Sequence, residues 1–168
     1  MIITRLTDAD ATAAMEILHG AVCYLRQQGI DQWQHGYPDR TIVDQDIKHG
    51  VAYGAFDGSI LCGVITLIRG EDINYIDTPI DWITAGNDYL TIHRIASIRD
   101  HFHCGIGHAL FNFAIDTARS CGVTSIRCDT HAKNKIMRHL LEYHGFTYCG
   151  SIILRTSNEP RVAYERMV

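Results

Sequence analysis

The chain has 168 residues, of which 46% are hydrophobic and 20% carry a charged side chain. This length suffices for one domain with a single core and is short for two ordinary domains. The formal net charge is −4, and the 15 Lys and Arg residues are dispersed, whereas nucleic-acid binders normally carry a basic stripe. We therefore expect one domain over residues 1–168, with no nucleic-acid partner.

Apolar runs and cysteines indicate the cellular compartment of the protein. No apolar run approaches the roughly 20 residues that a bilayer span needs, and charged residues interrupt the N-terminal segment where a secretory signal would be apolar. The six cysteines form no CxxC pair, and most lie in apolar strand or helix patterns, where reduced thiols are common. These features predict a cytoplasmic protein with free thiols and no membrane partner.

The first half of the chain predicts three strands and two helices. Residues 1–6 alternate weakly and indicate a strand. Asp8 is a favourable N-cap for a helix whose apolar residues recur at helical spacing up to Gly29. A short second helix is predicted within residues 41–50. Residues 51–68 contain two β-rich runs joined at an Asp-Gly pair, which is typical of a hairpin.

The second half begins with a long acidic connection, residues 70–88, that shows no clear period. Loops of this length within a compact domain are often functional. The remaining segments alternate between strand and helix patterns and end in two strands. They are predicted over residues 89–98 (strand), 105–122 (helix), 123–130 (strand), 133–145 (helix), 146–154 (strand) and 161–167 (strand). The order β-α-α-β-β-β-α-β-α-β-β indicates a mixed α/β domain.

Two glycines stand one residue apart between the strand 89–98 and the helix that follows it. The first N–H groups of a helix lack intrahelical partners, and the helix dipole adds about half a positive charge there. Glycine lets a ligand approach the backbone closely. The segment therefore predicts a phosphate or pyrophosphate site, although a turn that only packs the helix on the sheet is the alternative. The amides concerned belong to His103, Cys104, Gly105, Ile106, Gly107 and His108.

Three pyrophosphate-binding scaffolds can be compared with this segment. A P-loop needs GxxxxGK[ST], which the sequence lacks. A dinucleotide fold needs GxGxxG, but "GIGHAL" stops at its second glycine and the preceding strands form a hairpin rather than a βαβ unit. The third candidate ligand is coenzyme A.

The stretch "FHCGIG", residues 102–107, resembles the signature [QR]xxGx[GA] of the GNAT superfamily of N-acetyltransferases, with Phe102 in place of Gln or Arg. A second match is "NKIMRHLLEYHGF", in which Asn134 lies eleven residues before Gly145-Phe146. The order of elements also fits that fold along nearly the whole chain. The resemblance implies an α/β fold whose mostly antiparallel central sheet is splayed between strands 4 and 5 and flanked by about four helices.

The resemblance implies that acetyl-CoA is the co-substrate and that a primary amine of a small molecule or peptide attacks its thioester directly in a ternary complex. The pantetheine arm would bind like an added strand, on backbone groups of Ile95 and Ser97. The pyrophosphate would lie on residues 103–108. Asn134 would contact the cofactor, or else serve only as a polar residue at a helix N-terminus.

The same resemblance suggests catalytic groups on the fourth strand. The N–H of Ile95 would stabilise the developing oxyanion. His93 is the best candidate for the general base, because an imidazole titrates near neutral pH and alternation places it on one strand face with Ile95 and Ser97. The alternative for His93 is a histidine satisfied in the core or at its rim.

The sequence departs from the family at the general acid. Many members carry a Tyr four residues before the terminal Gly, where this chain has Leu141. Tyr143 is a weak substitute, since it lies about 200° further around the helix. Solvent or the ammonium proton of the substrate are the alternatives. The missing Tyr also leaves open a non-catalytic acyl-CoA-binding or regulatory module of the same fold.

Loop aromatics are candidates for the acceptor pocket. Trp33, Tyr37 and Trp82 lie in predicted loops and would either line this pocket or simply pack. Histidines and a cysteine cluster within residues 101–108, but their spacings fit no standard zinc pattern, so no metal is expected. The identity of the amine and a possible homodimer stay open.

Overall fold

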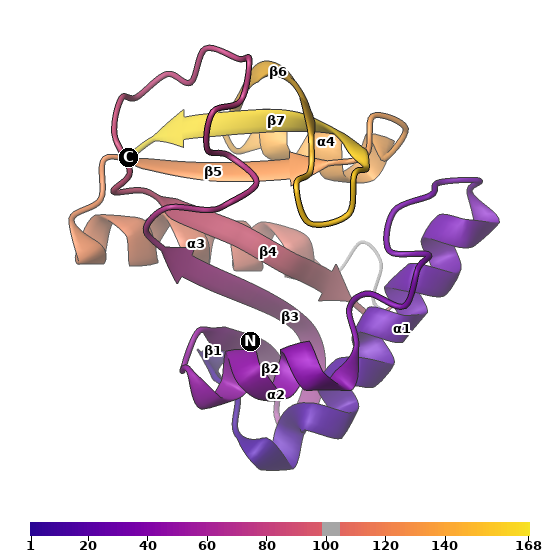
Figure 1. Ribbon diagram of the computed structural model, residues 1–168. Helices are drawn as coiled ribbons and strands as arrows, with labels where there is room; N and C mark the ends of the chain where they lie inside the picture. Colours follow the sequence, from indigo (N-terminus) through magenta and orange to yellow (C-terminus); the bar gives the residue numbers. More distant parts are fainter. Residues whose placement is uncertain (99–104) are drawn as a thin grey trace. The chain divides into compact units, whose positions relative to one another are not determined.

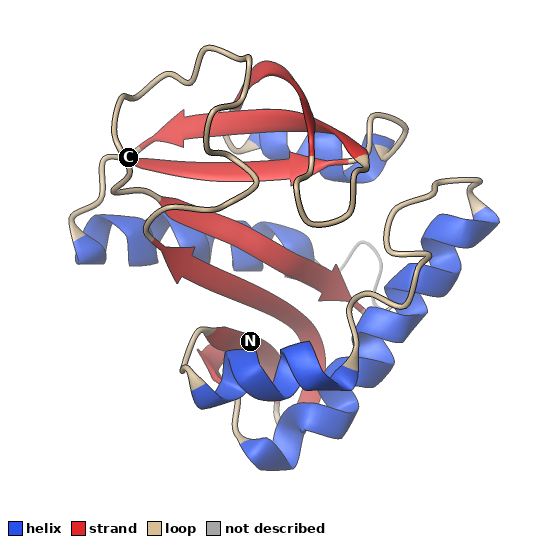
Figure 2. Cartoon of the chain, viewed as in Figure 1, coloured by secondary structure: helices blue, strands red, loops and turns tan. Residues whose placement is uncertain are grey.

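The computed structural model describes residues 1–98 and 105–168, and within them it contains the predicted elements in the predicted order (Figures 1 and 2). A sheet has the strand order β1-β2-β3-β4-β5-β7-β6. The α/β prediction is therefore confirmed. The elements are β1 (Ile2–Arg5), the 3-10 turn η1 (Asp8–Asp10), α1 (Ala11–Gln27), α2 (Arg40–Lys48), β2 (Ala52–Asp57), β3 (Ile60–Arg69), β4 (Leu90–Ser97), α3 (Ile106–Cys121), β5 (Ser125–Thr130), α4 (Lys135–Tyr143), β6 (Thr147–Ile153) and β7 (Pro160–Met167).

The residues gather into two compact units, each built from separate segments of the chain. The first comprises residues 1–67 and 93–113, and the second comprises residues 68–92 and 114–168. The single domain predicted over residues 1–168 stays a prediction.

The first unit has an apolar core between its helices and its antiparallel strands. α1 and α2 contribute Ala14, Ile17, Leu18, Val43 and Ile47 to a buried cluster that also holds residues of β2 and β3. These positions carry the helical spacing that predicted the two helices.

The start of α1 differs from the prediction that Asp8 caps it. Asp8 opens the 3-10 turn η1, and α1 begins at Ala11. The carboxylate of Asp10 accepts hydrogen bonds from the backbone N–H of Thr7 at 2.8 Å and from its hydroxyl at 2.7 Å. The polar residues before the helix therefore form a tight turn of their own, and the helix starts two residues later than an N-cap at Asp8 predicts.

A glycine in β3 lets α3 begin close to the strand. A Cβ on Gly63 would lie 2.6 Å from Cγ2 of Ile106 and 3.2 Å from the carbonyl oxygen of Ala96. Ile106, the first residue of α3, is only 2% exposed. The first turn of α3 is thus fixed against β3 within the first unit.

The second unit contains the antiparallel strands β5, β7 and β6. Alternation along β7 gives its two faces different neighbours. The Tyr164 hydroxyl accepts a hydrogen bond from Arg138 of α4, whereas the Glu165 carboxylate accepts one from the backbone of Ile83 in the long loop. α4 therefore covers one face of these strands, and residues 70–88 cover the other.

β4 and β5 are parallel, whereas β1–β2, β2–β3, β5–β7 and β6–β7 are antiparallel pairs. Their ladder comprises the pairs Leu90↔Ile126 and Thr91↔Arg127, although β4 runs on to Ser97 and β5 to Thr130. A ladder confined to the strand starts is the pairing expected of a sheet splayed between its fourth and fifth strands.

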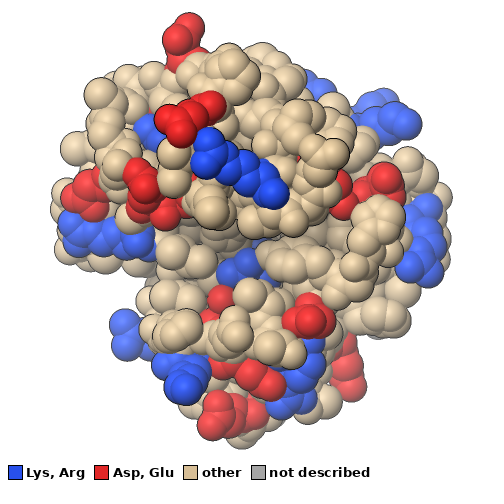
Figure 3. Space-filling view, viewed as in Figure 1, with Lys and Arg blue, Asp and Glu red and all other residues tan. Residues whose placement is uncertain are grey.

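Within the described residues, no helix combines the length and the apolar character that crossing a membrane requires. On the face drawn in Figure 3, Lys and Arg side chains are interspersed with Asp and Glu. The described cysteines are free thiols, as predicted: Cys23, Cys62, Cys121, Cys128 and Cys149.

Candidate functional site

Gly105 stands immediately before α3 and has a backbone conformation that suits glycine. Its φ is +75°, in the left-handed region. Its carbonyl accepts the N–H of Ala109 at 2.9 Å, so it caps the first turn of the helix. Gly105 is exposed, and no described atom lies within 4 Å of the position that a Cβ would occupy. Among the residues that the structure describes, none therefore blocks a ligand from this turn.

The first turn of α3 fits an anionic ligand. The N–H groups of Gly105, Ile106 and Gly107 have no carbonyl partner within the helix, and the dipole of a helix of this length favours negative charge at its start. Because Ile106 is buried against Gly63, these donors are held in place before any ligand binds. The predicted contributions of His103 and Cys104, and the Phe102 position of the motif, lie outside the described residues.

The C-terminal half of β4 carries the other predicted contacts of the first unit. His93, Ile95 and Ser97 are all half-buried. Arg94 between them has φ +44°, although it is not a glycine. The left-handed region is unfavourable for a long L side chain, and it interrupts the regular alternation of a strand. The common face of His93 and Ile95, which rests on that alternation, stays a prediction.

The aromatic residues of the loop between α1 and α2 lie together. The rings of Trp33 and Tyr37 meet edge to face with centroids 6.5 Å apart. Trp33 also packs against the core cluster of the first unit, and Tyr37 is 40% exposed. One ring of the pair is therefore held by the core while the other is accessible from outside.

Asn134 and Tyr143 belong to the second unit, at the two ends of α4. The Asn134 side-chain oxygen accepts a hydrogen bond from the backbone N–H of Met137 at 3.2 Å, so Asn134 caps this helix. This is the role of a polar residue at a helix N-terminus, the alternative to contacting the cofactor. Tyr143 is 68% exposed, whereas Leu141 is fully buried. The two side chains thus lie on different sides of α4, as their angular separation predicts.

Trp82 packs within the second unit. The Cζ atom of Arg127 lies 4.2 Å from the centroid of the Trp82 ring and 3.9 Å from that of Tyr89. The indole N–H donates to the Thr78 hydroxyl at 3.2 Å. These contacts favour the packing alternative for Trp82, because its ring covers a guanidinium of the same unit.

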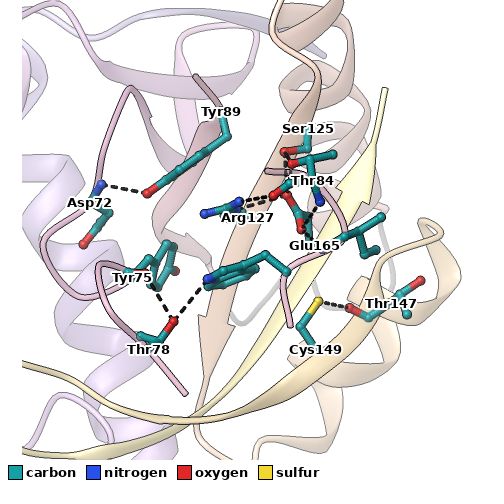
Figure 4. A network of polar contacts seen from close by, with 12 residues as sticks. Asp72, Tyr75, Thr78, Thr84, Tyr89, Ser125, Arg127, Thr147, Cys149 and Glu165 are labelled. Atoms are coloured by element: carbon teal, nitrogen blue, oxygen red, sulfur yellow. Dashed lines mark hydrogen bonds and ion pairs between the residues drawn. The ribbon is translucent and has the colours of Figure 1, made fainter. Parts of the chain in front are cut away.

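A buried carboxylate that the sequence did not single out organises the same region (Figure 4). Glu165 is fully buried and accepts hydrogen bonds from Nε of Arg127 at 3.0 Å and from the hydroxyls of Ser125 and Thr84, each at 2.6 Å. Burial raises the pKa of Glu165, but these hydrogen bonds outweigh it and the net pKa is lowered. The signal that the sequence offered was a charged residue in each of two predicted strands, Arg127 in residues 123–130 and Glu165 in residues 161–167.

Tyr75 attaches the long loop to β5. Its hydroxyl donates to the Asp129 carboxylate at 2.7 Å, and its ring contacts Trp82 with centroids 5.1 Å apart. Burial, followed by the negative charge of Asp129, raises the pKa of Tyr75 well above its ordinary value. The phenol therefore stays protonated and keeps this hydrogen bond at physiological pH.

Comparison with protein families identifies the chain. Residues 18–146 match the model of the acetyltransferase (GNAT) family, and the protein belongs to this family. The elements and the glycine turn before α3 are those that the motifs in the sequence implied. Comparison with curated proteins finds no match.

Solved structures with the same fold are numerous. A GNAT-family acetyltransferase from Streptococcus agalactiae is 29% identical with a TM-score of 0.86, covering 99% of this chain and 95% of that one. A ribosomal-protein-alanine N-acetyltransferase from Brucella melitensis is 16% identical with a TM-score of 0.73, covering 100% of both chains. A protein from Salmonella typhimurium, solved with its cofactor acetyl-CoA, is 15% identical with a TM-score of 0.71, covering 99% of this chain and 92% of that one.

Proposed function

We propose that the protein transfers an acetyl group from acetyl-CoA to a primary amine of a small molecule or peptide, by direct attack in a ternary complex. The observation that carries this proposal is the open Gly105 turn at the start of α3, in a chain of the GNAT family. The acetyl-CoA complex of a protein with the same fold supports the choice of ligand.

Backbone groups would hold most of the cofactor. The amides at the start of α3 bind the pyrophosphate, while Ile95 and Ser97 bind the pantetheine arm from β4. Phe102 has no side-chain donor, so these amides carry more of the affinity than in relatives with Gln or Arg there. Asn134 contributes only what its capping hydrogen bond leaves available.

Acetyl-CoA supplies the acetyl group as a thioester. The chain's own groups bind the carbonyl and take up the proton of the amine. The N–H of Ile95 donates to the carbonyl oxygen as negative charge develops there, a contact that is worth about 3 kcal/mol in comparable sites. His93 takes the proton of the attacking amine, directly or through a water.

A non-catalytic acyl-CoA-binding module is the second candidate function. It is favoured by the buried Leu141 at the position where relatives carry a Tyr, and by the exposure of Tyr143. As an enzyme, the protein would rely on Tyr143, on solvent or on the substrate's ammonium proton to protonate the leaving thiolate.

Calorimetric titration and a thiol-release assay test the two candidates. We expect acetyl-CoA and CoA to bind, and NAD and zinc not to bind. An amine panel including polyamines, aminoglycosides, amino acids and peptides with an N-terminal alanine should then accelerate CoA release. Peptides are included because a ribosomal-protein-alanine N-acetyltransferase shares the fold. Binding without acceleration by any amine would favour the non-catalytic module, and absence of binding would refute both.

Replacing His93 by alanine should lower turnover near neutral pH while acetyl-CoA affinity stays nearly unchanged. The loss is expected because general-base catalysis contributes about 10²–10⁴-fold. A pH–rate profile of the wild type and His93→Ala checks the role, since the base should appear as a limb that the variant lacks. Unchanged turnover would remove His93 as the base.

A further inference from the structure

A buried ion pair lies beneath β4 in the first unit. The guanidinium of Arg94 donates from Nε to Oδ2 of Asp46 at 2.6 Å and from Nη2 to Oδ1 at 3.0 Å. The Thr66 hydroxyl donates to the same carboxylate at 3.0 Å. Arg94 thus forms a bidentate pair with a residue of α2, and the pair fixes the orientation of the planar guanidinium.

This pair is well removed from solvent. Arg94 is 8% exposed and Asp46 is 6% exposed. Burial lowers the pKa of Arg94, but Tyr37 and Asp46 outweigh it, so its pKa lies above the ordinary value and the side chain stays charged. A buried pair of this kind resists separation, because either charge alone would be left uncompensated.

The pair also restrains the backbone of β4 between two candidate catalytic residues. Arg94 holds φ +44°, a conformation that costs an L residue free energy and persists only where its surroundings enforce it. The strand on either side carries His93 and Ile95. The contacts of the Arg94 side chain are therefore a means by which α2 holds this part of β4 in an unusual conformation.

The third contact of Arg94 reaches the loop between α1 and α2. Its Nη1 donates to the Tyr37 hydroxyl at 2.5 Å, and its Cζ lies 5.9 Å from the centroid of the Tyr37 ring. The ring of Tyr37 in turn contacts Trp33. The phenol of Tyr37 therefore connects the aromatic pair of the loop to the strand that bears His93 and Ile95.

We propose that the hydroxyl of Tyr37, held by the Arg94–Asp46 pair, is a positioning group that fixes the loop between α1 and α2 against β4 and thereby sets the geometry with which the amine acceptor binds. This inference rests on the proposed acetyltransferase function. Tyr37 acts through the loop and not on the reacting atoms, so its effect falls on acceptor binding.

The variant Tyr37→Phe tests this role, because it keeps the ring and removes only the hydroxyl. We expect KM for the amine to rise about tenfold, because without this hydrogen bond to a charged group the loop must be ordered when the amine binds. The kcat and the KM for acetyl-CoA should stay at the wild-type values, since the Arg94–Asp46 pair that restrains β4 between His93 and Ile95 is intact in this variant. Tyr148→Phe is the matched control, because its hydroxyl lies 3.2 Å from that of the exposed Ser151 on β6 in the second unit.

A second readout does not depend on activity. The chain contains two tryptophans, so 5-fluorotryptophan labelling gives two ¹⁹F resonances that Trp33→Phe assigns. Tyr37→Phe should shift or broaden the Trp33 resonance and leave that of Trp82 unchanged. Tyr148→Phe should leave the Trp33 resonance unchanged.

The outcomes separate this inference from the proposed function. An unchanged Trp33 resonance in Tyr37→Phe would overturn the inference, as would a displaced resonance with an unchanged KM for the amine. A wild-type protein that binds acetyl-CoA but accelerates with no amine would refute the proposed reaction and the positioning role with it. In that case the ¹⁹F comparison would still report whether the phenol holds the loop.

Discussion

Replacing Gly105 by alanine is expected to raise the Kd for CoA about tenfold to a hundredfold. The new methyl group would occupy the space in which the pyrophosphate is proposed to bind. In addition, φ +75° is a strained conformation for alanine. Hydrogen bonds to charged groups are worth about 1.5–3 kcal/mol each, so displacing one of them accounts for a loss of this size. Calorimetric titration of CoA into both proteins measures it.

Gly122→Ala is the matched control for this prediction. Gly122 follows the other end of α3, has φ +70°, and like Gly105 has no described atom within 4 Å of the position that a Cβ would take. Both variants should therefore lose a similar amount of stability, about 1 kcal/mol, from backbone strain. Only Gly105→Ala should lose affinity for CoA. Equal CoA affinity in the two variants would contradict the pyrophosphate site.

Much of the fold could be predicted because its signals are local. The helical spacing of apolar residues found α1 and α3, and the β-rich runs joined by an Asp-Gly pair found the hairpin of β2 and β3. The start of α1 was misplaced by two residues, since Thr7, Asp8 and Asp10 all favour a helix start and only their hydrogen bonds decide among them.

The buried ion pairs could not be predicted in the same way. Asp46 reads as a surface carboxylate of a short helix, and its partner lies 48 positions further along the chain. Arg127 and Glu165 face each other only because β5 and β7 pair in one particular antiparallel register. Such contacts depend on long-range pairing, which a local pattern does not encode.

The candidate site likewise has one part that local sequence patterns predict and one part that they do not. The glycine turn before α3 was predictable, because the conformation of Gly105 and the unpaired amides of a helix start follow from local geometry. The left-handed backbone of Arg94 was not, since alternation describes a regular strand and nothing in the sequence "IHRIAS" announces an interruption. The contacts of its side chain with Asp46 and Tyr37 explain this conformation.

Replacing Glu165 by glutamine is expected to lower the free energy of unfolding by about 3–5 kcal/mol, the cost of leaving a buried partner uncompensated. The amide cannot accept from all of the donors that now converge on the carboxylate, and the charge of Arg127 would remain buried. Because Glu165 also accepts the N–H groups of Ile83 and Thr84, the long loop should loosen, and hydrogen exchange over residues 70–88 should increase. Urea unfolding measures the free-energy change.

The pH dependence of stability gives the same residue a second, independent test. The pKa of Glu165 is lowered in the folded state, so its contribution is fully present above the unfolded value of about 4.3 and is lost as pH falls through the lower folded value. The stability difference between wild type and Glu165→Gln should therefore be constant near neutral pH and shrink below about pH 4. Asp88→Asn is the control, because Asp88 pairs with Arg69 on the surface at 2.8 Å and exposed ion pairs contribute little to stability. A Glu165→Gln protein no less stable than Asp88→Asn would show that the buried carboxylate does not hold the loop on the strands.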